Sequence, residues 1–475
     1  MTREKKFDII VLAKINIRRN KKIMEKFSRK NWLLLLVFGT VGQIAWSVEN
    51  MYFGTFVYNT FKGFVENVEA AKGNVILDTV TLMVQLSGIV ATVVTLVAGT
   101  LSDKLGNRRR FIYVGYIIWG VTVALFGCLT PDIVAFVLGK ESTQVVTLCL
   151  ALVVVGDCVM TLFGSMANDA AFNAWVTDNT KPSYRGYVES VLSILPLIGL
   201  LIVAGGLGIL TTAFGGYTPV FILLGALISI CGVAGIFLFK DSPDLEKSGD
   251  FRDIIYGFKP SVIKKHLPFY ATLLSVAVFG IAIQTFMSYL IIYMEQCLKF
   301  EVWEYSLVFA LAIIAGAVVN LFLGKLSDKV PKSKLLYFAA IILSVGLFAM
   351  YFASMIPTQH KAMLMISFGI GGFIMICGNI FSTALNGAIM RDHTPSEAAG
   401  KMQGVRMFAS VLIPMLVGPA IANTLNKNFG GGTLSGEAML TSLYVPAREI
   451  FLAGAIIALF ALAVIPLIVK AERKN

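Results

Sequence analysis

Apolar runs of about 20 residues or more alternate with short polar segments along the whole chain. About 20 consecutive apolar residues are what an α-helix needs to cross the hydrocarbon core of a membrane. The pattern therefore predicts an all-α membrane protein with twelve transmembrane helices. We expect the spans near residues 32–60, 75–98, 111–129, 143–174, 188–211, 218–239, 268–293, 304–324, 335–355, 362–390, 402–425 and 448–469.

The composition agrees with a membrane protein. Hydrophobic residues make up 57% of the chain and charged residues only 14%, whereas about a quarter of an average soluble protein is charged. The six cysteines form no CxxC pair, and His266, His360 and His393 fall in predicted loops, which argues against a disulfide framework, a zinc site or a haem attachment. GxSxG, HExxH and GxxxxGK[ST] motifs do not occur. The sequence thus predicts no enzymatic activity, no metal and no cofactor.

The net charge of +12 is concentrated in segments predicted to face the cytoplasm. With both termini inside, only seven of the 40 Lys and Arg residues fall on the outside, which satisfies the positive-inside rule. Residues 1–31 are expected to form a basic amphipathic segment on the membrane surface, and a disordered tail is the alternative. We predict a multi-pass protein of the plasma (inner) membrane that contacts lipid and does not bind nucleic acid.

The longest internal connection, residues 240–267, is polar and follows the sixth span. It is a cytoplasmic linker in this prediction and divides the spans into two sets of six. We therefore expect an N-terminal six-helix bundle at 32–239, a C-terminal six-helix bundle at 268–469 and a short tail at 470–475.

The two halves share a sequence repeat. GTLSDK at 99–104 follows the second span, and GKLSDK at 324–329 follows the eighth. A shift of 214 residues also aligns ANDAAFNAWVTDNTKPSYRG, which starts at Ala167, with FSTALNGAIMRDHTPSEAAG, which starts at Phe381. Matches at two equivalent places indicate a duplication. Repeats of this kind place a substrate cavity near the membrane midplane, between halves that can rock.

The segment GTLSDKLGNRRRF at 99–111 resembles the signature loop between helices 2 and 3 of the major facilitator superfamily. The resemblance implies two pseudo-symmetric six-helix bundles and a loop that latches one access state. We expect Gly99 to permit a close approach of helices and Asp103 to face a helix N-terminus or a basic partner. A basic turn without a latch is the alternative. The expected gate residues are Gly99, Asp103, Arg108, Asp178, Arg185, Asp328, Asp392 and Arg406.

Three stretches resemble the glycoside-pentoside-hexuronide cation symporter family, which includes the melibiose carrier. They are FGTVGQIAWSVENMYFGTF at 38–56, NDAAFNAWVTDNT at 168–180 and RDHTPSEAAGKMQG at 391–404. The resemblance implies cation-coupled sugar symport. It also implies that Asp169 corresponds to the helix-4 aspartate at the sugar and cation sites of the carrier.

The chain departs from that family at other functional positions. The helix-1 sugar-binding aspartate falls on Ile44, and the helix-4 tryptophan falls on Asn173. The two helix-2 cation carboxylates fall on Ala91 and Thr95. We therefore do not expect the sodium site of the melibiose carrier. We expect proton coupling through a carboxylate, with uniport as the alternative.

The first span carries an acid, Glu49, although a charge at the centre of a membrane helix costs roughly 2.5–3.5 kcal/mol. On an ideal helix, Gln43 and Asn50 share one stripe, Glu49 lies at its edge, and Trp46 and Phe53 flank it. Carboxylates and amides suit sugar hydroxyls, and an aromatic ring suits the apolar face of a sugar. The alternative is hydrogen bonding between neighbouring helices.

The fourth span carries Asp157 and Asp169. Since intramembrane acids commonly mark a proton or substrate pathway, Asp169 is our first choice for a coupling carboxylate. Pairing of Asp169 with a helix end or with Arg406 is the alternative. The candidate cation-coupling residues are Asp169, Glu49 and Asp157. The candidate substrate-binding residues are Gln43, Trp46, Glu49, Asn50, Phe53, Asn168, Asp169, Asn173, Trp175, Gln284, Tyr289 and Asn379.

Together these patterns predict a monomeric secondary active transporter that carries a sugar or glycoside with a cation, by alternating access. An exporter, or a carrier of lipid-like or drug-like amphiphiles, is the alternative and would be expected to have a largely apolar cavity. A membrane sensor is disfavoured because no polar segment is long enough to form an output domain.

Overall fold

The computed structural model describes residues 28–64, 74–180, 188, 191–192, 194–242, 245, 251–326, 330–394, 402–430 and 445–472. Within these ranges the chain is helical and has no β-strand. Twelve helical segments in the described ranges are long and apolar enough to cross a membrane. The predicted all-α fold with twelve transmembrane helices is therefore confirmed. Most of the basic segment at 1–31 lies outside the described residues.

The first six spans lie between residues 29 and 238. Three of them contain a short π-helical turn, in which one extra residue widens the helix. The elements are α2 (Arg29–Val48), η1 (Glu49–Phe53), α3 (Gly54–Phe61), α4 (Val75–Leu105), α5 (Arg108–Phe126), α6 (Pro131–Leu138), α7 (Val146–Gly164), η5 (Ser165–Phe172), α8 (Asn173–Asp178), α10 (Leu195–Ile202), η6 (Val203–Leu207), α11 (Gly208–Ala213) and α12 (Tyr217–Leu238).

The last six spans follow two short helices, α13 and α14. His393, expected in a loop, is instead the last residue of α19, where its Nδ1 lies 2.9 Å from the Ile389 carbonyl oxygen. The elements are α13 (Arg252–Tyr256), α14 (Pro260–Lys265), α15 (Leu267–Met287), α16 (Leu290–Gln296), α17 (Val302–Leu326), α18 (Lys332–Ala353), α19 (Lys361–His393), α20 (Gln403–Met407), η9 (Phe408–Leu412), α21 (Ile413–Phe429) and α22 (Glu449–Glu472).

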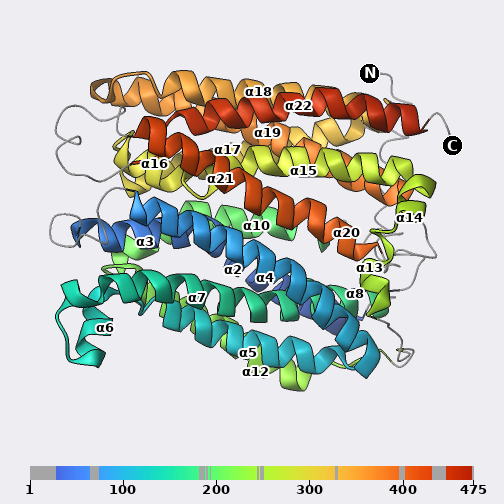
Figure 1. Cartoon of the computed structure of the whole chain (residues 1–475), viewed down its shortest axis with the longest axis horizontal. Helices are drawn as coiled ribbons and strands as arrows, with labels where there is room; N and C mark the ends of the chain where they lie inside the picture. The colour runs from blue at the N-terminus through green and yellow to red at the C-terminus, as the bar shows by residue number, and fades with distance from the viewer. Residues whose placement is uncertain are drawn as a thin grey trace, which may run out of the picture.

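The helices form two groups, one from each half of the chain (Figure 1). In the first group α5 packs on α12 and α4 on α7, and in the second α18 packs on α19 and α15 on α22. The groups meet where α4 contacts α21 and where α10 and α11 contact α17. We propose residues 240–267, which contain α13 and α14, as the boundary between the two bundles.

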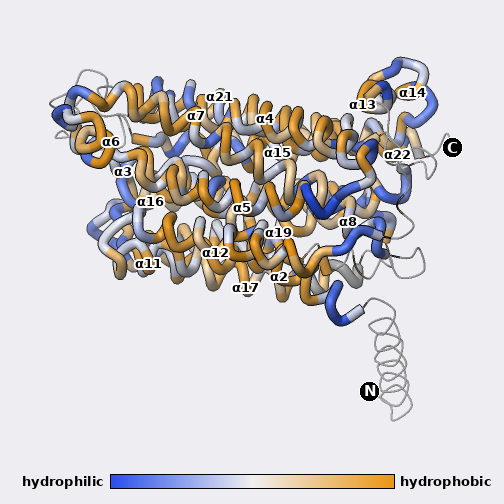
Figure 2. Tube along the Cα trace, turned by 90° about the horizontal axis from the view of Figure 1, so that it is seen from below, coloured by the Kyte–Doolittle hydropathy of each residue, from blue (hydrophilic) through white to orange (hydrophobic). Residues whose placement is uncertain are grey.

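Hydrophobic residues dominate the middle of the molecule and hydrophilic residues gather at its two ends (Figure 2). One end carries α6 and the opposite end carries α13 and α14; we call them the α6 end and the α13 end. This distribution is what a membrane imposes, because apolar side chains face the lipid while charges stay in the water on both sides.

Small residues allow α5 and α12 to pack closely. A Cβ atom added to Gly120 of α5 would collide with the Gly225 carbonyl oxygen of α12, and the reverse also holds. Such contacts matter in a membrane, where helices associate through van der Waals packing rather than through the hydrophobic effect. Gly99 was expected to have this role, but its position is open, with nothing within 4 Å of an added Cβ.

Candidate functional site

A cavity of about 560 Å³ lies between the two groups of helices. Its volume falls in the range of small-molecule sites. The first half contributes residues of α2, η1, α4, α7 and η5, and the second half contributes residues of α15, α19, η9 and α21. The polar residues that line it are Gln43, Glu49, Asn50, Ser87, Thr161, Asp169, Gln284, Asn379, Thr383, Asn386 and Ser410.

The first span provides four of the predicted substrate residues to the cavity wall, namely Gln43, Trp46, Glu49 and Asn50. Glu49 is buried, and its Oε1 accepts a hydrogen bond from the Thr161 hydroxyl of α7 at 3.1 Å. The Asn50 amide donates to the Trp46 carbonyl oxygen at 2.8 Å. The side chain of Trp46 packs against Trp119 of α5, which supports one edge of the indole ring.

Asp169 lines the cavity from η5, the π-helical part of the fourth span. The neighbouring Asn168 does not line it. Asn168 is buried toward α5, where its Oδ1 lies 3.1 Å from the Tyr116 hydroxyl, and its amide reaches Asp169 at 3.4 Å. Trp46 and Ser165 also lie beside the Asp169 carboxyl group. Asn168 is therefore placed to position Asp169 rather than to contact a ligand.

Four other predicted substrate residues lie away from the cavity lining. Phe53 stacks on Phe126, with 4.0 Å between ring centroids, because the π-helical turn η1 changes the direction in which it points. Asn173 is exposed and donates to the Asp169 carbonyl oxygen. The Trp175 indole donates to the Lys240 carbonyl oxygen at 2.7 Å. Tyr289 bonds Thr81 instead, as described below.

The remaining predicted residues, Gln284 and Asn379, line the cavity from the second half. Sequence reasoning did not select Ser87, Thr383, Asn386 and Ser410, which also line it. Small hydroxyl groups are common in membrane helices as interhelical hydrogen-bond partners, so their presence in a span is not diagnostic. The signal that could have found Asn386 is that it is, like Asn379, an amide side chain within the predicted span 362–390.

Several buried polar atoms around the cavity have no hydrogen-bond partner among the described residues. They include the Trp46 indole N–H, Glu49 Oε2 and Asn386 Oδ1. Buried polar groups are nearly always paired in folded proteins, so each unpaired group calls for an explanation. The three residues line one cavity from both halves, but these particular atoms are buried within its wall rather than exposed to it.

Several polar contacts between the two halves lie at the α6 end, and Gln85 of α4 also donates to the Leu416 carbonyl oxygen of α21 at 2.8 Å. Asp78 of α4 accepts from the Asn423 amide at 2.6 Å and pairs with Lys427 at 2.8 Å, both on α21. The Thr81 and Tyr289 hydroxyls lie 2.5 Å apart. These contacts close the α6 end.

A second cluster reinforces this closure. The Asn59 amide of α3 donates to Glu295 Oε2 of α16 at 2.9 Å, and the Tyr305 hydroxyl of α17 donates to Oε1 of the same carboxylate at 3.1 Å. Toward the opposite end, the cavity reaches Met390 of α19.

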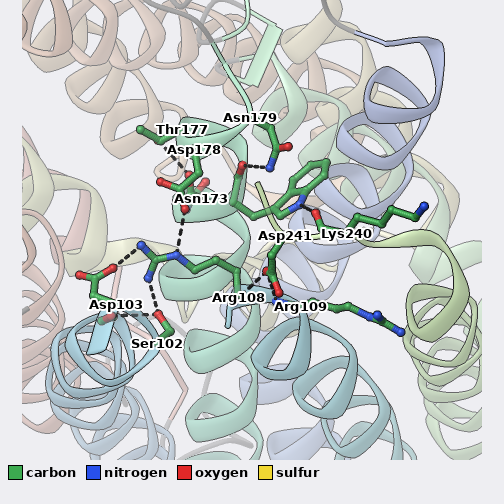
Figure 3. Close-up of polar contacts among 12 residues, drawn as sticks. Ser102, Asp103, Arg108, Arg109, Asn173, Thr177, Asp178, Asn179, Lys240 and Asp241 are labelled. Carbon is green, nitrogen blue, oxygen red and sulfur yellow. Dashed lines mark hydrogen bonds and ion pairs between the residues drawn. The ribbon is translucent and has the colours of Figure 1, made fainter. Parts of the chain in front are cut away.

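At the α13 end, the predicted gate residue Arg108 joins three parts of the first half (Figure 3). Its guanidinium pairs with Asp103 at the end of α4 and, through Nε, with Asp178 Oδ2 of α8 at 3.0 Å. Asp241, which follows α12, accepts from the backbone N–H groups of Arg108 and Arg109. Asp103 thus meets the expected basic partner, and Asp241 caps the N-terminus of α5.

The second half repeats part of this arrangement. Lys332 at the start of α18 pairs with Asp392 at the end of α19, at 2.5 Å. The pair corresponds to Arg108 and Asp178, which join the equivalent helices of the first half. Arg406 is exposed on α20. Two further expected gate residues, Arg185 and Asp328, lie outside the described residues.

Comparison with known proteins gives a consistent picture. The sequence profile of the Major Facilitator Superfamily matches residues 50–387. A probable sulfoacetate transporter, SauU of Cupriavidus necator, is 24% identical over 386 residues, which span 74% of this chain and 81% of the relative.

Solved transporters share the fold at low sequence identity. A D-xylose-proton symporter is similar with a TM-score of 0.67 and 14% identity, over 90% of this chain and 97% of that one. A bacterial homologue of the human lysosomal transporter Spinster, in an inward-facing and unoccupied conformation, gives a TM-score of 0.64 and 13% identity, over 94% and 98% of the two chains. At such identities the likeness concerns the fold alone.

Proposed function

Because the chain belongs to the major facilitator superfamily and is a multi-pass membrane transporter rather than an enzyme, we propose that it carries a sugar or glycoside together with a cation by alternating access. The observation that carries this proposal is the cavity between the halves, which is lined by amide and hydroxyl side chains beside the Trp46 indole ring. The melibiose-carrier-like patches of the sequence point to the same substrate class.

The chemistry of the cavity favours a neutral polyhydroxyl substrate. Gln43, Asn50 and Gln284 offer amides that can both donate to and accept from hydroxyl groups. Trp46 offers a flat apolar surface for a sugar ring. The opposite wall contains apolar residues of the second half, such as Phe279 and Met415, which would suit the aglycone of a glycoside.

An anionic substrate of the kind named for the sulfoacetate transporter fits less well. The charged side chains that line the cavity are the acids Glu49 and Asp169, and no Lys, Arg or His occurs among the lining residues that the structure describes. A buried anion placed beside these carboxylates would meet repulsion in a medium of low dielectric constant. An amphiphile carrier is disfavoured by the polar wall of the first half.

We propose that Asp169 takes part in the coupling, with Glu49 and Asp157 as the other candidate acids, and we expect the cation to be a proton. The Asp169 carboxyl group lies on the cavity wall, next to a candidate substrate residue, Trp46. Because the two groups adjoin, protonation of Asp169 would change the charge and hydrogen bonding that the substrate meets, and bound substrate would change the proton affinity of Asp169. This mutual effect would couple proton binding to substrate binding. The D-xylose-proton symporter, similar in fold, is named for this type of coupling.

The placement of charges orients the proposed transporter. The loops at the α13 end carry most of the Lys and Arg residues, so we propose that this end and both termini face the cytoplasm, in the plasma membrane. With the α6 end closed by contacts such as Asp78 to Lys427, the conformation would then be inward-facing. The inner gate contains the Arg108 cluster in this proposal.

The test is uptake of labelled mono- and oligosaccharides and glycosides into proteoliposomes under an imposed pH or sodium gradient. We expect accumulation driven by an inward proton gradient for the parent and for Asp132→Asn, a control at an exposed residue of α6. Asp169→Asn should lose accumulation against a gradient while retaining binding or exchange. Absence of uptake of every sugar under both gradients would refute the proposal and favour an exporter or amphiphile carrier.

A further inference from the structure

Two acids of the first half, Glu49 and Asp157, lie near each other in the first and fourth spans, and only Glu49 lines the cavity. Glu49 belongs to η1 and Asp157 to α7, one turn before Thr161. Their side chains are buried, with residue exposures of 8% and 1%. The two carboxyl groups are close enough to interact electrostatically. Burial of two adjacent carboxylates without compensation would be strongly unfavourable.

The described surroundings supply hydroxyl groups but no positive charge. Thr161 donates to Glu49 Oε1 at 3.1 Å, and Ser87 of α4 faces Asp157. The other titratable groups near the pair are Asp169 and the Cys158 thiol. No described Lys, Arg or His pairs with either acid.

One oxygen of each carboxylate is left without a partner. Glu49 Oε2 and Asp157 Oδ1 are both buried and make no hydrogen bond to a described residue. Thr161, Ser87 and Glu49 line the cavity, whereas Asp157 lies behind them. A cation held by the pair would meet oxygen atoms of four side chains, those of Glu49, Asp157, Thr161 and Ser87.

We infer that Glu49 and Asp157 form a single site for one monovalent cation, a proton or Na⁺, held with the help of the Thr161 and Ser87 hydroxyls. A divalent ion such as Ca²⁺ is disfavoured because it takes six to eight oxygen ligands, more than these four side chains supply. The role of this site in transport rests on the proposed function, because a cation bound next to the cavity would couple to a substrate bound inside it.

The site differs from the sodium site of the melibiose carrier. The helix-2 positions that hold carboxylates in that carrier are Ala91 and Thr95 in this chain. Here the second span offers only a hydroxyl, Ser87, one turn before Ala91, and the two acids come from the first and fourth spans. The cation would thus sit between the first, second and fourth spans.

The experiment uses the purified full-length chain in nanodiscs, without any sugar. Na⁺, Li⁺ or K⁺ replaces choline at constant ionic strength, and the melting temperature is followed by tryptophan fluorescence, because a ligand that binds only the folded state raises it. Proton release on Na⁺ addition, and proton uptake after an acid pulse, are measured with a pH dye. The variants are Glu49→Gln, Asp157→Asn, their double variant, Asp169→Asn and the control Asp132→Asn.

Two results support the site and identify its ion. In the first result, Na⁺ raises the melting temperature and releases up to one proton, and this response is lost in Glu49→Gln and in Asp157→Asn but kept in Asp132→Asn. That result indicates that Na⁺ binds in exchange with a proton. In the second result, Na⁺ has no effect, but each single variant takes up one proton fewer than the parent and the double variant loses no more than that. That result indicates that the site binds a proton and not Na⁺. A double variant no worse than either single variant is the signature of one shared ion.

Two other results overturn it. If the parent and the double variant behave alike in both measurements, the pair is a structural element with no exchangeable cation. If only Asp169→Asn removes the response, the cation binds at Asp169. Should the acid variants fail to fold, Ser87→Ala and Thr161→Val provide the same comparison with both carboxylates retained. Because no sugar is present, failure of this test is distinct from failure of the transport proposal.

Discussion

Lys427 of α21 lies 2.8 Å from Asp78 of α4, so that an ion pair ties the two halves of the molecule together at the α6 end. The side chains are 49% and 41% exposed, and an exposed pair contributes only about 0–1 kcal/mol. That amount hardly affects folding. It is, however, enough to change the ratio of two access states by up to about fivefold, because 1.4 kcal/mol is a factor of ten.

We therefore predict that Lys427→Gln opens the α6 end more often without unfolding the protein. In a cysteine-free background carrying Ile283→Cys on the cavity wall, a membrane-impermeant maleimide applied from the α6 side should react about two- to fivefold faster, with an unchanged melting temperature. Lys140→Gln, an exposed change in the loop after α6, is the control and should leave the labelling rate as it is. Equal rates in both variants would show that this ion pair does not stabilise the closed end.

Removal of the Arg108 guanidinium should destabilise the α13 end. Arg108 is buried and is paired with Asp103 and Asp178. Its loss leaves two carboxylates without a counter-charge, and because these are 37% and 23% exposed the cost falls below the ~3 kcal/mol of a fully buried pair. We expect Arg108→Ala to lower the melting temperature and to reduce transport at least tenfold.

Arg110→Ala is the matched control, since Arg110 lies on the same turn of α5 but is exposed. Surface substitutions of this kind usually change stability by less than about 0.5 kcal/mol. Similar losses of stability in the two variants would mean that the Arg108 network has no special structural role.

The two glycines Gly120 and Gly99 should respond in opposite ways to the same substitution. Gly120→Ala places a methyl group against the Gly225 backbone, and overpacking of this kind typically costs about 1–3 kcal/mol. Gly99→Ala meets open space and should be neutral or slightly stabilising in a helix. Thermal denaturation of both variants in detergent tests this, and a larger loss for Gly99→Ala would contradict the packing described here.

Substitutions of Trp46 and Phe53 should have different effects, one on substrate binding and the other on stability. Trp46 lines the cavity, and its loss in Trp46→Ala should raise the KM for the substrate by at least tenfold, because stacking and an indole hydrogen bond are removed together. Phe53 packs on Phe126 and Phe221, so Phe53→Leu should lower the melting temperature and leave KM unchanged. If KM rises in Phe53→Leu and not in Trp46→Ala, Phe53 contacts the substrate, as the helical projection of the sequence predicted.

Thr161→Val should weaken the proposed cation site while preserving its shape. The hydroxyl donates to Glu49, and a hydrogen bond to a charged group is worth about 1.5–3 kcal/mol. We expect the cation affinity to fall about 10- to 100-fold in the melting-temperature titration. Thr92→Val is the control, because the Thr92 hydroxyl donates only to the Gly88 carbonyl of its own helix. A loss of the same size in the control would attribute the effect to helix packing.

The number of spans and the division into halves followed from the sequence alone. A membrane requires about 20 apolar residues for each span and keeps charges at the ends, and both features can be read along a single dimension. The repeated LSDK segments and the aspartates at 178 and 392 were visible for the same reason, as local patterns. Glu49 could also be recognised from the sequence as a candidate functional residue, because a carboxylate within a membrane span is energetically costly at any position.

The face of each helix that meets the cavity was decided by the tertiary structure. The helical projection assumed a uniform α-helix, but η1 inserts a π-helical turn after Glu49, which turns Phe53 toward Phe126 and away from Asn50. No residue type in the first span signals such a turn. Widened turns are stabilised by the packing of neighbouring helices and not by local propensity.

Contacts between the halves were equally beyond the sequence. Asp78 and Lys427 lie far apart along the chain, at the start of α4 and near the end of α21, and no local pattern links them. The relative orientation of the two bundles determines which polar residues come into contact. That orientation is a property of packing in three dimensions. The sequence by itself determined that a membrane transporter fold would form and where its acids lie along the spans; the packing of the bundles decided which of those acids share a cavity, and with which partners.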